Sequence, residues 1–294
     1  MTKVALTIAG LDPSGGAGII ADIKTFSAFG CFATAAVTSL TFQNTVGVFG
    51  AVNQTAESVR GQVKPILRDF TVSALKTGML PTREVIEEVA RLVRGNNLGN
   101  FVVDPVVRST SGFDLIDDEA LRALIEKLFP LASVVTPNIP EAERIARMKI
   151  EKPDDIRRAA RIMRDFGARA VLIKGGHLPI LDFRLPVADL EYESNDAELI
   201  NERQTRNDEG RKAIDFMLTG EREFTFSADF IETTATHGTG CTFAAAITAN
   251  LANGKTLPEA VETAKRFVTE AIRTAPNLGH GHSPVNHSLA NFGL

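Results

Sequence analysis

The feature that most limits the fold of this chain is an alternation of short apolar segments with longer segments of helical period. Five runs rich in Val, Ile and Leu are typical of buried strands: residues 4–10, 72–78, 101–107, 133–138 and 170–176. Four segments with helical spacing follow or separate them: residues 56–70, 83–95, 119–129 and 154–167. Such alternation predicts an α/β protein with a mostly parallel central sheet and helices on both faces.

Several of the apolar runs end in residues that are suited to chemistry. A glycine-rich turn at residues 9–18 follows the first run, Asp104 follows the third, and Lys174 ends the fifth. Ligands of open α/β sheets bind at the carboxyl ends of the strands. We therefore expect these residues to meet at one rim of the sheet.

Each of these rim segments has a functional and a purely structural interpretation. The glycine-rich turn can bring its backbone amides close to an anion, or it can be a mobile turn. Asn138 and Glu141 begin a helix and can help hold hydrated Mg²⁺, or they can serve only the helix start. Lys174 can follow phosphate oxygens, or it can be solvated at a strand end.

A second glycine-rich segment, Gly238 to Gly240, leads directly into Cys241 and an apolar run of helical character. A helix that begins at Gly240 or Cys241 would offer free amides to a phosphoryl group and lower the pKa of the thiol. The resulting thiolate could accept a hydroxyl proton. A lone cysteine can also be a buried small hydrophobic residue, which is our interpretation of Cys31.

Composition excludes several classes of function. A net charge of −4 over 294 residues leaves no positive field for nucleic acid or an anionic membrane. The two cysteines lie in unrelated segments, which favours a reducing, cytoplasmic location without disulfides. Residues 25–56 carry no charge, but glycine, glutamine and asparagine interrupt them, so we expect buried strands there and no membrane span.

Seven motifs, taken in order, resemble those of a known enzyme family. They are AGLDPSGGAGIIADIKTF, TFQNT, LKTGML, VVDPVV, TPNIPEAE, LIKGGH and THGTGCT. This pattern is similar to the hydroxymethylpyrimidine and phosphomethylpyrimidine kinases of thiamine synthesis, which have the ribokinase-like fold. The resemblance implies one kinase domain over residues 1–294, a homodimer, and ATP- and Mg²⁺-dependent phosphorylation of 4-amino-5-hydroxymethyl-2-methylpyrimidine and of its monophosphate.

The resemblance also implies roles for individual residues. The pyrimidine would lie near Gly10, Asp22, Gln43, Met79 and Val106. The catalytic group would be Cys241 as base, Gly238, Thr239 and Gly240 as anion hole, and Lys174. ATP would face Asn138, Glu141, Lys174 and Thr236, and the metal would lie near Asp104 and Glu141.

The sequence departs from the family pattern at several places. Leu11 stands where a small hydroxyl residue is expected and Phe42 where alanine is expected, so both could reshape the substrate pocket. Residues 108–112 lack a lysine that is often present in the family, and Arg108 is the candidate to replace its charge. A pyridoxal kinase and a non-catalytic pyrimidine sensor therefore remain as alternatives.

One segment is longer than the family pattern. Residues 188–212 contain eight acidic and four basic side chains, which predicts a charged surface insertion. A hairpin around Thr219 and Gly220 is expected to follow it.

Overall fold

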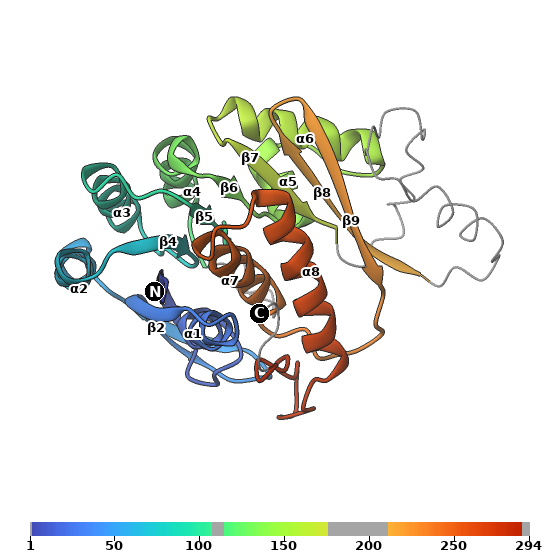
Figure 1. The fold of residues 1–294 in the computed structure, drawn as a ribbon, viewed down its shortest axis with the longest axis horizontal. Helices are drawn as coiled ribbons and strands as arrows, with labels where there is room; N and C mark the ends of the chain where they lie inside the picture. The colour runs from blue at the N-terminus through green and yellow to red at the C-terminus, as the bar shows by residue number, and fades with distance from the viewer. Residues whose placement is uncertain (1, 108–114, 176–210, 290–294) are drawn as a thin grey trace.

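A computed structural model describes residues 2–107, 115–175 and 211–289 of the chain (Figure 1). The strands in these ranges form one nine-stranded sheet in the order β3-β2-β1-β4-β5-β6-β7-β8-β9. Their bounds are β1 (Val4–Leu11), β2 (Phe32–Gln43), β3 (Val48–Asn53), β4 (Val72–Thr77), β5 (Phe101–Val103), β6 (Val134–Val135), β7 (Ala170–Lys174), β8 (Lys212–Thr219) and β9 (Arg222–Asp229). The six central strands, which are β2, β1, β4, β5, β6 and β7 in sheet order, are parallel to one another. Strand β3 pairs antiparallel with β2, and β8 pairs antiparallel with β7.

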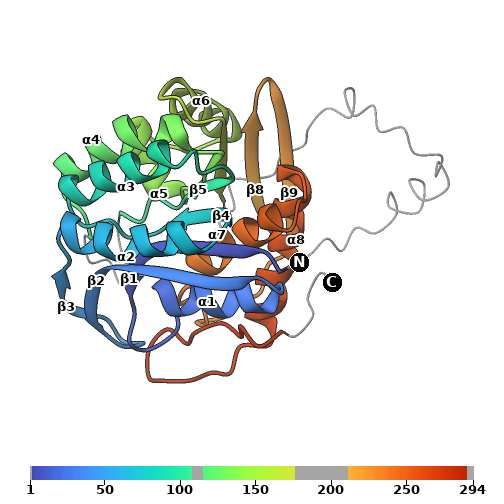
Figure 2. The ribbon, with the colours of Figure 1, turned by 60° about the vertical axis from the view of Figure 1, so that its left-hand side comes forward.

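Helices cover both faces of the sheet, which confirms the expected fold class. One layer holds α2 (Ala56–Asp69), α3 (Arg83–Gly95), α4 (Asp118–Lys127), α5 (Ile139–Ala146) and α6 (Pro153–Asp165). The other layer holds α1 (Gly18–Ala28), α7 (Thr239–Ala252) and α8 (Leu257–Arg273). Figure 2 shows β1 and β2 between α2 on one side and α1 on the other.

The central strands read as continuous apolar runs because neighbouring residues enter two different cores. On β5, Phe101 and Val103 pack with the α2–α6 layer, whereas Val102 packs with the layer of α1, α7 and α8. On β7, Val171 and Leu172 divide in the same way. Alternate side chains of a strand point to opposite faces, so a sheet covered on both sides needs apolar residues at every position.

Proline explains why two strands are shorter than their apolar runs. Residues 101–107 give a strand that ends at Val103, and residues 133–138 give one that ends at Val135. Pro105 and Pro137 follow within two residues, and proline has no N–H to donate to a ladder. The polar residues between strand and proline are thereby left at the rim of the sheet.

Other expectations have clear outcomes within the described ranges. The hairpin is confirmed as β8 and β9, with Gly220 at φ +56° in the turn. Residues 25–56 form the end of α1 and then β2 and β3, and none of the helices in the described part of the chain has the length and apolar character needed to cross a membrane. Residues 108–112, and all but the last two residues of the predicted insertion at 188–212, lie outside the described ranges.

Candidate functional site

A cavity of about 760 Å³ opens at the carboxyl ends of the parallel strands, and we call it the central cavity. Every predicted site residue except Asp22 lines it: Gly10, Gln43, Met79, Asp104, Val106, Asn138, Glu141, Lys174, Thr236, Gly238, Thr239, Gly240 and Cys241. These residues come from the ends of β1, β2, β4, β5, β6 and β7 and from the start of α7. Parallel strands therefore bring together residues that are up to 231 positions apart, from Gly10 to Cys241.

The first glycine-rich turn is held by the carboxylate of Asp12, a residue that the sequence analysis did not select. Its oxygens accept hydrogen bonds from the amides of Ser14 and Ala17, both at 2.8 Å, and lie 2.7 Å from Nε2 of His237. These bonds fix the turn and occupy two of the amides that were expected to face an anion. The turn is thus neither mobile nor open to an anion at those two positions.

Asp12 also joins the two glycine-rich segments of the chain. Burial opposes its charge, but hydrogen bonds from His237, Gln43 and Ser14 hold the pKa of the carboxyl well below its usual range. His237 belongs to the motif that contains Cys241. An Asp that precedes Pro and Gly commonly binds nearby amides, which was the available sequence signal, but nothing in the sequence pointed to its bond with His237.

The two turns also touch through their backbones at Gly238. This residue is the N-cap of α7 and has φ +77°, a left-handed conformation that favours glycine. A Cβ atom at Gly238 would lie 1.8 Å from the carbonyl oxygen of Gly16, so no other residue fits without moving one of the turns. The start of α7 and the first turn consequently form one continuous wall of the central cavity.

The start of α7 has the geometry of an anion site. The helix begins at Thr239, one residue before the expected start. Its first backbone hydrogen bond of the α-helical type, from residue i to residue i−4, runs from the amide of Thr242 to the carbonyl of Gly238 at 2.9 Å. The amides of Gly240 and Cys241 precede that bond and so have no place in the intrahelical ladder. They lie beside the cavity, where the positive end of the helix dipole stabilises negative charge.

Cys241 differs in one respect from the expectation. Its side chain lines the cavity and is only partly exposed. Burial raises the pKa of the thiol to about 11, and Lys76 and the Gly18 amide only partly offset this effect. The prediction that this pKa is lowered is therefore wrong, and loss of hydration around the thiolate is the largest cause of the increase. Cys31 is a buried core residue, as expected.

A buried charged group lies on the wall of the cavity beside the start of α7, where a Cβ atom on Gly240 would be 3.3 Å from Nζ of Lys174. The ammonium of Lys174 donates to Oδ1 of Asp104 at 2.9 Å, and the hydroxyl of Thr136 donates to the same oxygen at 3.1 Å. Lys174 is thus paired and largely buried rather than simply solvated. Glu141 lines the same wall, and burial, together with the nearby Asp104, raises its pKa to about 7 against the opposing effect of Lys174.

Asn138 and Glu141 form a capping box at the start of α5. The amide of Glu141 donates to the side chain of Asn138, and the amide of Asn138 donates to the carboxylate of Glu141, both at 2.8 Å. The helix-start interpretation of this pair therefore holds, and both residues line the cavity as well. A helix cap fixes the direction of the Glu141 carboxylate, which is what a ligand-binding role would also need.

Leu11 and Phe42, which were both expected to reshape the substrate pocket, lie in different places relative to the cavity. Leu11 lines the cavity beside Gly10. A Cβ atom added at Gly10 would lie 3.2 Å from the sulfur of Met79. Phe42 is 54% exposed and lies outside the cavity lining, because alternate residues of β2 point to opposite faces and Gln43 points inward. The expectation that Phe42 reshapes the pocket is wrong.

Asp22 also lies elsewhere than expected. It sits in the second turn of α1 and is fully buried behind the wall of the cavity. Its carboxylate accepts hydrogen bonds from the hydroxyl of Thr7 at 2.6 Å and from the ammonium of Lys76 at 2.9 and 3.0 Å. Direct contact with a pyrimidine is therefore not what its position supports, since its oxygens already bind two buried partners.

Comparison with known proteins identifies relatives that match almost the whole chain. Residues 12–286 match the family described as phosphomethylpyrimidine kinase. A hydroxymethylpyrimidine/phosphomethylpyrimidine kinase of Haemophilus influenzae is 40% identical over 286 residues, which cover 97% of this chain and 96% of that protein.

Solved structures are similar over almost the same length. An ADP complex of Bacillus subtilis pyridoxal kinase has a TM-score of 0.80 and 35% identity, and the match covers 98% of each chain. A phosphomethylpyrimidine kinase from Clostridium difficile has a TM-score of 0.73 and 36% identity, with 92% of this chain and 100% of that chain covered.

Proposed function

The chain belongs to the phosphomethylpyrimidine kinase family, and from this premise we propose that it transfers a phosphoryl group from ATP to 4-amino-5-hydroxymethyl-2-methylpyrimidine and then to the monophosphate, in thiamine biosynthesis. One observation supports this reaction most strongly. The thiol of Cys241, the free amides at the start of α7 and the ammonium of Lys174 line a single cavity with the polar side chain of Gln43. That cavity offers a proton acceptor, an anion site and a polar group for a heteroaromatic ring.

The pyrimidine subsite in this proposal lies between the ends of β1, β2 and β4. Gln43 has both a donor and an acceptor, which suits a ring edge that carries a nitrogen and an amine. The sulfur of Met79 is polarizable and packs well against an aromatic face. Gly10 keeps the backbone of β1 close to that face, and Val106 lines the same cavity.

The nucleotide would occupy the side of the cavity where Asn138, Glu141, Lys174 and Thr236 lie. When bound with ATP, Mg²⁺ neutralises phosphate charge, and the carboxylates of Asp104 and Glu141 are oxygen donors of the type that it prefers. The raised pKa of Glu141 fits this role, because a buried carboxylate with an acidic neighbour gains from an added cation. Two carboxylates suffice, since Mg²⁺ in kinases also takes oxygens from phosphates and water.

Phosphoryl transfer asks mainly for positioning and charge stabilisation from the protein. Within the expected anion hole the amide of Gly240, together with the next amide at Cys241, would bind the migrating phosphoryl group at the positive end of α7. Lys174, whose ammonium lies beside Gly240, would balance the charge of that group. Cys241 would accept the proton of the substrate hydroxyl, and this would leave the alcohol oxygen free to bond to phosphorus.

A kinase assay with defined acceptors tests the proposal. Purified protein is incubated with ATP and, separately, the pyrimidine alcohol, its monophosphate and pyridoxal, and the phosphorylated products are measured by mass spectrometry. We expect both pyrimidine acceptors to be phosphorylated with a higher kcat/KM than pyridoxal. Loss of the monophosphate reaction alone would restrict the function to the first step.

Pyridoxal kinase is the second candidate, and the fold shared with the Bacillus subtilis pyridoxal kinase favours it. A clear preference for pyridoxal in the same assay would establish this alternative. The non-catalytic sensor loses half of its support, because Phe42 lies outside the cavity and only Leu11 remains. Binding of the pyrimidine without phosphate transfer from ATP would favour the sensor.

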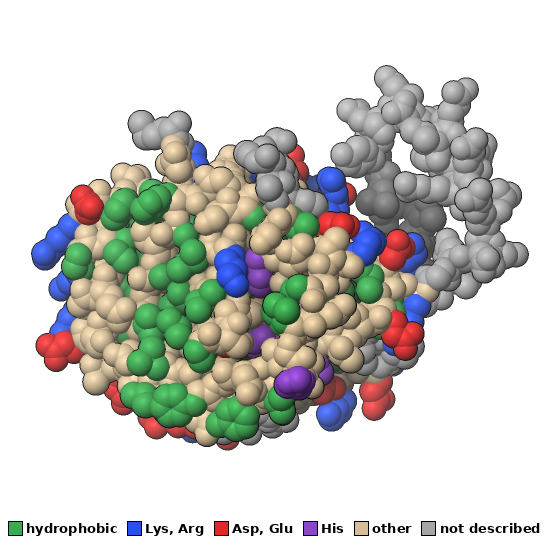
Figure 3. Space-filling view, turned by 90° about the horizontal axis from the view of Figure 1, so that it is seen from below, with side chains coloured by type: hydrophobic (Ala, Val, Ile, Leu, Met, Phe, Trp, Pro, Cys, Tyr) green, Lys and Arg blue, Asp and Glu red, His purple; other side chains and the backbone are tan. Residues whose placement is uncertain are grey.

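We propose that the enzyme is a one-domain homodimer of the cytoplasm. All nine described strands form one sheet, and both cysteines are free thiols, as a reducing compartment allows. Exposed hydrophobic residues gather on the end of β2, on β3 and on their connection: Leu40, Phe42, Val46, Phe49 and Val52. Figure 3 shows adjacent hydrophobic patches on the lower face of the molecule.

Such a patch on a monomer marks an interface. In the double variant Phe42→Ser, Phe49→Ser, we expect light scattering to give the mass of one chain where the unaltered protein gives two. An unaltered protein that is already monomeric at micromolar concentration would refute the dimer.

A further inference from the structure

Lys76 is a lysine with no access to solvent, and the proposed mechanism leaves it without a role. It lies on β4, and its side chain is 0% exposed. A lysine is almost never fully buried without a partner, because removal of its hydration is unfavourable. Its position therefore needs a reason beyond packing.

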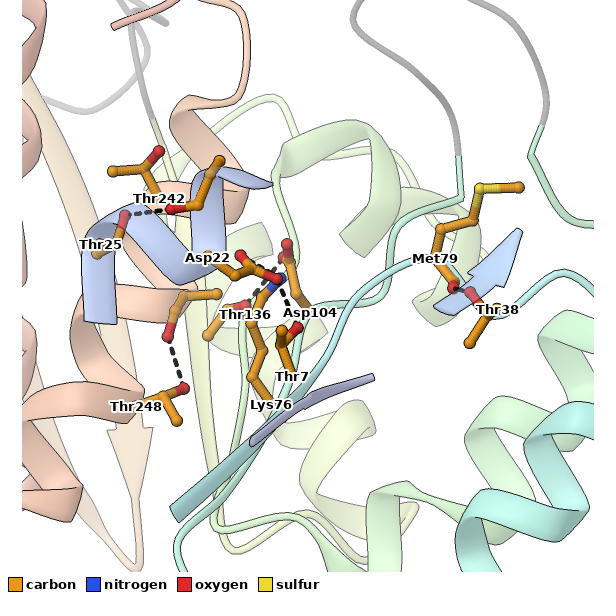
Figure 4. Close-up of polar contacts among 12 residues, drawn as sticks. Thr7, Asp22, Thr25, Thr38, Lys76, Met79, Asp104, Thr136, Thr242 and Thr248 are labelled. Atoms are coloured by element: carbon orange, nitrogen blue, oxygen red, sulfur yellow. Dashed lines mark hydrogen bonds and ion pairs between the residues drawn. The ribbon is translucent and has the colours of Figure 1, made fainter. Parts of the chain in front are cut away.

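The partner of Lys76 is Asp22 on α1. The ammonium donates to both carboxylate oxygens, at 2.9 and 3.0 Å, and Thr7 on β1 donates to one of them at 2.6 Å (Figure 4). Burial opposes the charge of Lys76, but the carboxylate of Asp22 more than offsets this and raises the pKa of the ammonium. Lys76 is therefore a cation at neutral pH. An apolar pair of similar volume often gives equal or greater stability, so stability alone is a weak explanation of this ion pair.

The pair lies behind the wall of the central cavity. A Cβ atom on Gly78, which lines the cavity, would be 3.2 Å from Nζ of Lys76, so the ammonium is one atom layer from the cavity wall. Asp22 is one helical turn after Gly18, which lines the central cavity together with Cys241. Helix α7, which carries Cys241, packs against both α1 and β4.

From this geometry we infer that Lys76 is a positioning residue for the thiol of Cys241: its ammonium, held in place by Asp22, stabilises the thiolate from inside the protein when the substrate proton is accepted. The inference rests on the proposed role of Cys241. It assigns to Asp22 the task of fixing Lys76, in place of contact with the pyrimidine.

Among the described residues, four charged groups act on the thiol, and their signs make the inference testable. Lys76 on β4 favours the thiolate, whereas Asp104 after β5 and Asp22 on α1 disfavour it. Lys174 at the end of β7 also interacts with the thiol. Among these groups, Lys76 has the largest effect on the pKa of Cys241 after burial itself.

The experiment measures the thiol directly. The alkylation rate of Cys241 by iodoacetamide is followed by mass spectrometry as a function of pH, in the unaltered protein and in Lys76→Met. Since the substitution removes the cation and leaves a buried carboxylate, we expect the pKa of Cys241 to rise by about one unit or more, or at least tenfold less thiolate at a given pH. The pKa of Cys31 in the same samples is the internal control and should not move.

A second variant separates charge from structure. Asp22→Leu combined with Lys76→Met removes both charges and replaces a buried ion pair by an apolar one, which proteins often tolerate. We expect the pKa of Cys241 in this variant to lie between those of the unaltered protein and Lys76→Met. In Lys76→Met, kcat should be at least tenfold lower than in the unaltered protein from about pH 7 to about pH 9 and should still rise with pH, in step with the lower alkylation rate of Cys241.

Two other outcomes overturn the inference, and they can be told apart. If Lys76→Met folds and loses turnover but leaves the alkylation rate of Cys241 unchanged at every pH, Lys76 is only structural, and the proposed function stands. If the thiol pKa shifts as expected but Cys241→Ala keeps full turnover, the role of Cys241 as base fails instead.

Discussion

If Cys241 is the base, the rate of phosphorylation must follow the fraction of thiolate. With the pKa of the buried thiol raised to about 11, only about one enzyme in a thousand carries the thiolate at pH 8, because each unit below the pKa lowers that fraction tenfold. The pyrimidine kcat/KM should therefore rise about tenfold per pH unit from about pH 7 to about pH 9 without levelling off. An ordinary thiol, with a pKa near 8.5, would give a profile that bends near that value.

The assay is steady-state kinetics at saturating ATP, in buffers of constant ionic strength, for the unaltered protein and for Cys241→Ala. Removal of the base should lower kcat by about 10²- to 10⁴-fold and leave a rate that hardly changes with pH. Circular dichroism and pyrimidine binding provide the controls, since the substitution should preserve both. A flat profile in the unaltered protein, or the same slope in Cys241→Ala, would refute the assignment of the thiol as base.

Three further predictions follow from contacts in the cavity walls. Lys174→Ala should lower kcat by about 10²-fold or more while the Kd of the pyrimidine changes little, because the ammonium faces the phosphoryl side; calorimetry that finds equal losses in binding and turnover would contradict this. Gly238→Ala should destabilise the fold by about 3 kcal/mol or more, since its Cβ would overlap the Gly16 carbonyl at a positive φ, and a melting temperature within a degree or so of the unaltered value would argue against the rigid wall. Asp12→Asn should lose about 1–3 kcal/mol at neutral pH. Because the pKa of Asp12 is lowered, its carboxylate stabilises the fold above about pH 4, and this contribution disappears as the pH falls. The free energy of unfolding in urea should therefore change less between neutral and acidic pH in Asp12→Asn than in the unaltered protein.

The sequence by itself determined the fold class and the composition of the rim. Apolar runs such as residues 101–107 and 170–176 specify strands buried on both faces, and their polar ends must gather where parallel strands terminate. The helices over 83–95 and 154–167 followed from spacing alone, and α3 and α6 agree with them to within two residues. These features depend on the chemistry of near neighbours in the chain, which the sequence displays directly.

Only the tertiary structure decided how the rim residues act on one another. The bond between Asp12 and His237 joins residues 225 positions apart, and the pair of Asp22 and Lys76 joins residues 54 positions apart. The raised pKa of Cys241 reverses the expectation from its helix position, and desolvation is the largest cause of the increase. Local sequence patterns indicate which groups reach the site. The pKa of each group depends on how much water packing excludes and on which charges packing brings close, and the neighbouring residues in the chain do not reveal either.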